Sequence, residues 1–159
     1  MNVVLRAATQ EDYDAVSALY AQVARIHAQA LPQFFRLVEG PALPQEFFTE
    51  ILANEDAAVF VAEQQDTMIG MIHCCMRTTP SLLVVVPRRF VYIEDLVVSE
   101  HFRSQGVGQI LVERVHHWAR EKGVTEVELG VWEFNTPART FYEKLGYQTT
   151  RRVMRKQLL

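Results

Sequence analysis

The sequence has few of the residues that mark secreted, membrane-bound or nucleic-acid-binding proteins. Its two cysteines, Cys74 and Cys75, are adjacent, which suits neither a structural disulfide nor a C-x-x-C redox pair. No apolar run approaches membrane-spanning length, and the N-terminus lacks the features of a signal peptide. The net charge of −3 provides no basic field for DNA or RNA. We therefore expect reduced thiols, a cytoplasmic location, and neither a nucleic-acid nor a membrane partner.

Metal-binding and nucleotide-binding patterns are also missing. His73 and Cys75 alternate along one predicted strand, but no further cysteine or histidine completes a ligand set, so no metal is assigned. A Walker loop ends in Gly-Lys-Ser/Thr, whereas here Gly108 is followed by Gln109. The dinucleotide fingerprint requires a third small residue where Leu111 stands. These absences exclude a P-loop and disfavour NAD binding.

The patterns that are present suit one globular domain spanning residues 1–159, with 49% hydrophobic and 22% charged residues. Alternating or β-branched runs predict strands over 3–7, 57–63, 67–77, 91–98, 124–132 and 147–158. Helical spacing and capping signals predict helices over 13–30 and 45–54, between Gly108 and Gly123, and from Asn135 or Thr136 to Gly146. This order of elements predicts an α/β sandwich around a mixed sheet.

Two connections carry apolar residues without a periodic pattern. Phe34 and Phe35 lie in the proline-containing segment 31–44, where they either pack on the core or line a substrate pocket. The apolar run 82–86 lies between Pro80 and Pro87. It could extend the preceding hairpin, cover a sheet edge or contact a second subunit, so a homodimer is possible.

The most informative stretch runs from Phe90 to Trp118 and predicts a strand, a glycine-rich turn and a helix. A helix start offers unpaired N–H groups and the positive end of the helix dipole, which together attract anions. Gly106 and Gly108 would let a phosphate approach the backbone, and Arg103 adds a permanent positive charge. The turn is therefore predicted to hold a phosphate or pyrophosphate.

Two motifs together resemble a known family. Arg103-Ser-Gln-Gly106-Val-Gly108, after a strand and before an amphipathic helix, resembles the acyl-CoA pyrophosphate loop of the GNAT superfamily of N-acetyltransferases. The segment from Val131 to Tyr147 resembles the second half of that family's signature, in the right order and at about the right distance. The resemblance implies a GNAT-like α/β fold, with a mixed, mostly antiparallel central sheet of six or seven strands flanked by about four helices. It also implies a cleft for acyl-CoA where two strands splay apart.

By this resemblance acetyl-CoA is the co-substrate, and three groups of residues contact it. The backbone of Leu96, Val97 and Val98 would pair with the pantetheine arm as an added strand does. Asn135 would approach through its side-chain amide and Ala138 by being small. The pyrophosphate would lie on the turn, formed by Arg103, Ser104, Gln105, Gly106, Val107, Gly108 and Gln109.

Two catalytic residues follow. The resemblance implies that Tyr142 protonates the departing CoA thiolate. The alternative is that Tyr142 only packs its ring against neighbouring elements of the fold. Glu94 and Asp95 should lie on opposite faces of their strand, because side chains alternate along it. Similar family members use the first of two such acids near the amine, so Glu94 is the predicted base and substrate contact. A bulge would invert this parity, and many relatives deprotonate the amine through water.

The predicted function is transfer of an acetyl group from acetyl-CoA to a primary amine by direct attack in a ternary complex. The alternative is an acyl-CoA-binding sensor or scaffold without turnover, which would keep the Arg103 loop but could dispense with Tyr142. The sequence leaves the acceptor open among small amines, polyamines, amino sugars and protein amines.

Overall fold

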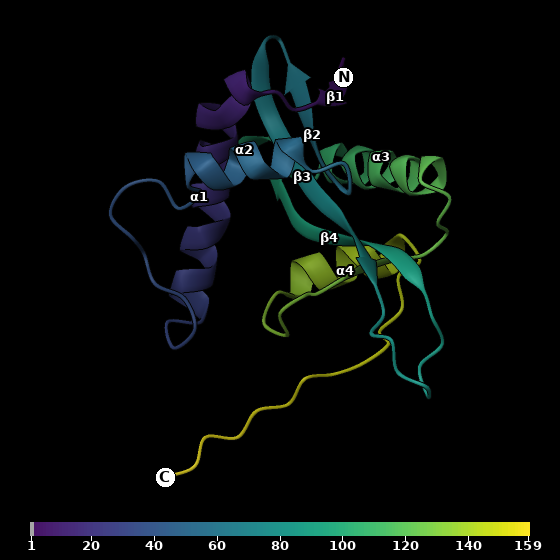
Figure 1. Ribbon diagram of the computed structural model, residues 1–159. Helices are drawn as coiled ribbons and strands as arrows, with labels where there is room; N and C mark the ends of the chain where they lie inside the picture. Colours follow the sequence, from purple (N-terminus) through teal and green to yellow (C-terminus); the bar gives the residue numbers. More distant parts are fainter. Residues whose placement is uncertain (1) are drawn as a thin grey trace.

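The computed structural model describes residues 2–159 (Figure 1). Within this range the chain forms five strands and four α-helices, with two short 3₁₀ turns at Gln10–Asp12 and Glu100–Phe102. The strands are β1 (Val4–Ala7), β2 (Ala57–Gln64), β3 (Thr67–Thr78), β4 (Arg89–Val98) and β5 (Val127–Leu129). The helices are α1 (Tyr13–Ala30), α2 (Gln45–Ala53), α3 (Val107–Glu121) and α4 (Thr136–Lys144). None of these helices is both long and apolar enough to cross a membrane.

One mixed sheet forms the centre, with its strands in the order β1-β2-β3-β4-β5. The first four strands pair antiparallel, whereas β5 pairs parallel to β4. The α/β sandwich with a mostly antiparallel sheet is therefore confirmed, but the sheet has five strands rather than six or seven in the part of the chain described.

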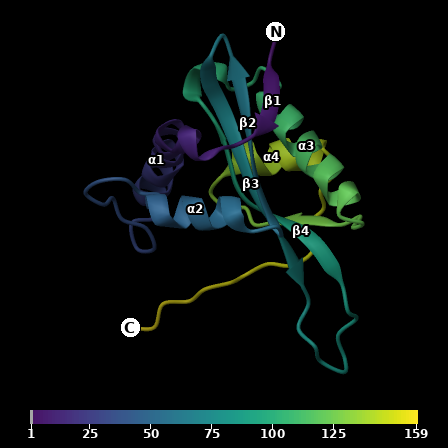
Figure 2. The same cartoon turned by 45° about the horizontal axis from the view of Figure 1, so that its top comes forward.

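The helices cover the two faces of the sheet, as Figure 2 shows. Helices α1 and α2 lie on one face, where Val16, Leu19 and Phe48 pack against Val59, Val61, Met71 and Val97 of the sheet. Helices α3 and α4 lie on the other face over a larger core that includes Leu111, Val115, Ile72, Val91 and Tyr142. The apolar periodicity of the sequence has thus placed each helix with its buried stripe against the sheet.

A β-bulge in β4 changes the direction of its side chains. His73 pairs with Asp95 and Cys74 with Ile93, so Glu94 is an extra residue without a partner on β3. Such an insertion breaks the two-residue alternation of the strand. On both sides of the bulge β4 therefore presents apolar side chains to the face covered by α3 and α4, namely Val91, Ile93, Leu96 and Val98.

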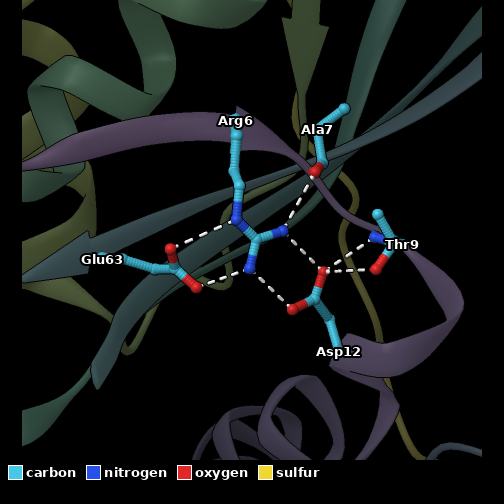
Figure 3. Close-up of polar contacts among 5 residues, drawn as sticks. All are labelled: Arg6, Ala7, Thr9, Asp12 and Glu63. Atoms are coloured by element: carbon cyan, nitrogen blue, oxygen red, sulfur yellow. Dashed lines mark hydrogen bonds and ion pairs between the residues drawn. The ribbon is translucent and has the colours of Figure 1, made fainter. Parts of the chain in front are cut away.

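A charged cluster ties the first strand to its surroundings (Figure 3). The Arg6 guanidinium donates to both carboxylate oxygens of Asp12, at 2.7 and 2.8 Å, and also to Glu63 on β2. The backbone N–H of Thr9 donates to Asp12 at 2.7 Å. One carboxylate therefore links β1 to the turn that begins α1.

The strand predicted over 147–158 is absent, and this prediction was wrong. The tail after Tyr147 has no regular secondary structure, and residues 148–159 are exposed. Its apolar residues are adjacent rather than alternating: Val153 is 87% and Met154 90% exposed. Strand β5 is also shorter than the predicted 124–132, so it offers a short edge for pairing.

The run 82–86 lies in the loop that joins β3 to β4. Thr78 pairs with Arg89, and the N–H of Thr79 donates to the Arg88 carbonyl, so the loop continues the hairpin. The hairpin and the tail both extend away from the body in Figure 1. Four side chains of the loop are exposed, namely Leu82, Leu83, Val84 and Val86.

Candidate active site

The second half of β4 has an open edge. Strand β5 pairs with β4 at Val91, Tyr92 and Ile93, and its regular structure ends at Leu129. Within residues 2–159 no strand pairs with this edge of β4 from the bulge to Val98. The backbone groups pointing outward there can accept an added extended chain. The predicted contact at Leu96, Val97 and Val98 lies on this edge.

Helix α3 begins beside the end of β4. Gly106 precedes its first residue with a φ of 86°, a left-handed conformation that L side chains rarely adopt. The first N–H with a helical partner is that of Ile110, which donates to the Gly106 carbonyl. The preceding N–H groups and the positive end of the helix dipole are the features that attract anions, and the predicted phosphate contact stays a prediction.

The two glycines of the turn have different roles. A Cβ on Gly106 would meet no atom within 4 Å, so the space around it is open to a ligand. A Cβ on Gly108 would lie 3.2 Å from the Phe141 ring and 3.7 Å from Val98. A side chain at position 108 would therefore press on the Phe141 ring where β4, α3 and α4 meet. The prediction that both glycines serve phosphate approach omitted this packing.

The polar residues of the turn are held by local bonds. Arg103 donates through Nε to the Val98 carbonyl at 3.2 Å, and the Gln105 amide donates to the His101 carbonyl at 3.0 Å. Ser104 takes a φ of 60°, and Gln109 donates to Glu113 at 2.8 Å. Arg103 is thus anchored beside the open edge. Its guanidinium keeps further donors for a phosphate.

Asn135 and Ala138 lie at the start of α4. The Asn135 side-chain oxygen accepts from the Ala138 N–H at 3.2 Å and caps the helix. The Asn135 NH₂ group keeps its two donors for another partner. Pro137 fits the first turn because its missing N–H would have no helical acceptor.

Tyr142 is 9% exposed, and its ring packs edge-on against Phe141 and Tyr147, with centroids 5.0 and 5.5 Å away. Burial raises the pKa of Tyr142 well above its ordinary value of 10.0, with smaller contributions from Tyr147 and Asp95. The hydroxyl therefore keeps its proton at neutral pH, as a proton donor must.

The expectation that Glu94 and Asp95 lie on opposite faces was wrong. Glu94 accepts from Cys75 at 3.1 Å and from Arg77 at 2.5 Å, whereas Asp95 lies 3.6 Å from His73. These three residues of β3 alternate along the strand, so both carboxylates face the side of α1 and α2. The bulge produces this arrangement, and sequence periodicity could not place it.

Asp95 occupies the more central position. Burial raises the pKa of Tyr20, with smaller contributions from the charges of Asp95 and Glu94. Burial lowers the pKa of His27, and the charge of Asp95 opposes that shift. Asp95 also lines, with Tyr20 and His73, a small cavity of about 20 Å³ under α1 and α2. Glu94 is paired with Arg77 at 2.5 Å, whereas Asp95 lies 3.6 Å from His73. The choice of Glu94 as base stays a prediction.

Phe34 and Phe35 belong to an aromatic cluster, defined here as the rings of His27, Phe34, Phe35, Trp132 and Phe134. Phe34 stacks on Trp132 at 5.5 Å, and Phe35 meets the same ring edge-on at 5.5 Å. Phe35 also stacks on His27 at 5.0 Å. The cluster thus joins the end of α1, the α1–α2 loop and the segment before α4.

Trp132, Phe134 and His27 were not singled out as site residues from the sequence. The signal that could have found Trp132 and Phe134 is two aromatic residues in the polar stretch just before the Asn135 cap. Trp132 is 41% and Phe134 39% exposed, so their rings remain accessible. Within residues 2–159 no group of three metal-ligating side chains is gathered.

Known proteins resemble this chain in both sequence and fold. The chain matches the acetyltransferase (GNAT) family over residues 20–147. It is 26% identical over 144 residues to the uncharacterized N-acetyltransferase YhfO of Bacillus subtilis. The alignment covers 91% of this chain and 89% of that protein. A mutant of protein BH1408 from Bacillus halodurans is 30% identical, with a TM-score of 0.93 over 98% of this chain and 99% of that one.

The fold also resembles that of the aminoglycoside N-acetyltransferase AAC(6')-Iy, solved in complex with CoA. Its TM-score is 0.73 at 22% identity, over 98% of this chain and 99% of that one. At 22% identity this similarity shows a shared fold and nothing about substrates. The match over residues 20–147 includes the open edge of β4, the start of α3 and all of α4. The chain therefore belongs to the acetyltransferase (GNAT) family.

Proposed function

We propose that the chain transfers the acetyl group of acetyl-CoA to a primary amine by direct attack in a ternary complex. The observation that carries this proposal is the open edge of β4 after the bulge, with the start of α3 at its end. An extended amide chain suits the edge, and a pyrophosphate suits the helix start. The CoA found with the structurally similar AAC(6')-Iy supports the same ligand class.

The residues present fit the pyrophosphate and the pantetheine arm of acetyl-CoA. Gly106 leaves open space at the start of α3, and Arg103 is anchored to the Val98 carbonyl beside it. The Asn135 NH₂ group supplies donors from the start of α4. Acetyl-CoA would supply the activated acetyl group. The protein would supply the binding groups and the proton donor.

In the proposed reaction the amine nitrogen bonds to the thioester carbonyl carbon while the carbon–sulfur bond breaks. The Tyr142 hydroxyl, protonated because its pKa is raised, donates its proton to the leaving sulfur. The amine loses its proton to a carboxylate of the β4 bulge, directly or through water. Glu94 was the choice from sequence, and the Arg77 contact of Glu94 now favours Asp95.

A thermal-shift titration with acetyl-CoA, followed by thiol release against a panel of amines, tests the proposal. We expect stabilisation by acetyl-CoA and release of CoA thiol that depends on an amine. Stabilisation without thiol release from any amine would instead identify an acyl-CoA sensor. The absence of both effects would overturn the assignment of acetyl-CoA to the open edge of β4 and the start of α3.

A further inference from the structure

A cation already lies on the aromatic cluster. The guanidinium carbon of Arg155 lies 5.0 Å from the centroid of the Phe34 ring, within the range of a cation–π contact. Phe34 is 45% exposed and stacks on Trp132, so a large π surface faces solvent at this place. The tail thus places a positive charge against the α1–α2 loop.

The tail that carries this cation is strongly basic. Arg151, Arg152, Arg155 and Lys156 lie within six consecutive positions, and no acidic residue follows Glu143. The tail lacks regular structure and its residues 148–159 are exposed. Arg155 therefore reaches the Phe34 ring from an exposed segment.

The aromatic cluster leads to the carboxylate of the bulge. Phe35 stacks on His27 near the end of α1. Tyr20 lies seven residues earlier on the same face of this helix, and it lines the small cavity under α1 together with Asp95. Among residues 2–159 the basic group that pairs with Asp95 is His73, at 3.6 Å. A molecule reaching from Phe34 to Asp95 would therefore meet a ring face that attracts cations and then a carboxylate.

We propose that the aromatic cluster binds a second positive charge of the acceptor, so that the acceptor is a diamine or polyamine whose reacting nitrogen lies at the β4 bulge. This inference rests on the proposed acetyl transfer. Arg155 then occupies the place of the second charge in the free protein and competes with the acceptor. Loss of the Phe34 ring should therefore weaken the binding of a diamine, whereas loss of the Arg155 charge should strengthen it.

The first experiment compares kcat/KM for a series of linear diamines with that for monoamines of matching length. We expect the diamines to be preferred. Phe34→Leu should lower kcat/KM for the diamines by about 2- to 30-fold, the range that a cation–π contact provides, while the monoamines change little. Phe34→Tyr keeps an aromatic face and should retain the preference. A thermal melt of each variant verifies folding.

The second experiment removes the competing cation. Arg155→Gln should lower KM for the diamines and leave KM for the monoamines unchanged. Arg151→Gln removes the same charge from the same tail and serves as the matched control, with no change expected. Calorimetric titration of a diamine into the acetyl-CoA-loaded and free protein measures its binding without relying on turnover.

Each outcome separates the two proposals. Thiol release with equal kcat/KM for diamines and monoamines would overturn the acceptor inference and leave acetyl transfer intact. Equal losses for both amine classes in Phe34→Leu would mean that the ring acts by packing, which also overturns the inference. Absence of thiol release with every amine would overturn the proposed acetyl transfer. Diamine binding lost in Phe34→Leu would still support the cation site in that case.

Discussion

Tyr142 is nearly buried, and the proposed reaction assigns its hydroxyl the role of proton donor to the leaving sulfur. Tyr142→Phe keeps the ring that packs against Phe141 and Tyr147 and deletes only the proton donor. Stability and acetyl-CoA affinity should change little, while the chemical step slows by about 10²- to 10⁴-fold. A single-turnover measurement checks this. An unaltered rate would return Tyr142 to a packing role.

The two carboxylates of the bulge make separate predictions. Because Glu94 is held by Arg77 whereas Asp95 faces His73, we expect Asp95→Asn to remove or shift the acid limb of the pH–rate profile. Glu94→Gln should have the smaller effect, and acetyl-CoA affinity should hold in both variants. If Glu94→Gln alone removes the acid limb, the choice made from the sequence is right.

At the residue scale the sequence indicated positions better than directions. It singled out Tyr142, Asn135 and Gly106 because their residue types match a motif, and the structure places Gly106 at the start of α3, Asn135 at the cap of α4 and Tyr142 within α4. It could not predict which face of the sheet Glu94 and Asp95 point to, because one inserted residue in β4 inverts the alternation of side chains. The contact of Phe34 with Trp132 joins residues far apart in the chain, which no local pattern reveals.

The start of α3 allows a test at the level of the whole element. Gly106→Asp places a negative charge where the pyrophosphate would lie, so acetyl-CoA affinity should fall at least about tenfold, as expected for losing a charge-assisted contact. Gly123→Asp is the matched control, because Gly123 lies beyond the other end of α3 with a φ of 74°. Both substitutions should cost stability, but calorimetry should show that only Gly106→Asp weakens binding.

The elements themselves were largely predictable. Helices with a clear apolar stripe, such as Tyr13–Ala30, and the hairpin of β2 and β3 formed close to their predicted limits. The prediction of a strand in the tail failed because the residues between Gln148 and Leu158 alternate only weakly. A strand also requires a partner edge, which the sequence does not show. Pairing is a property of the fold rather than of the segment.

At the scale of the whole molecule, the Arg6–Asp12–Glu63 cluster couples stability to pH. The hydrogen bonds from Arg6 hold the pKa of Asp12 below its ordinary value of 3.8, outweighing the effect of burial. A carboxyl with a lowered pKa stabilises the fold above its unfolded pKa, and this contribution is lost as the pH falls through the folded pKa. Acid should therefore weaken the link between β1 and α1.

Asp12→Asn measures this coupling. At neutral pH the substitution should lower the free energy of unfolding by about 1–3 kcal/mol, because a charged partner of Arg6 is lost. The difference from the unsubstituted protein should shrink as the pH falls below about 4. Urea unfolding at several pH values provides the comparison. A difference that stays constant down to acid pH would show that the charge of Asp12 contributes nothing.

The open edge of β4 has a consequence for amide hydrogen exchange. In an extended strand successive N–H groups point to opposite sides, so between the bulge and Val98 alternate amides point toward β3 or away from it. The inward amides should exchange slowly and their outward neighbours quickly. Acetyl-CoA should slow the outward amides and leave the inward ones unchanged. This alternating protection would trace the bound pantetheine arm in the unmodified protein.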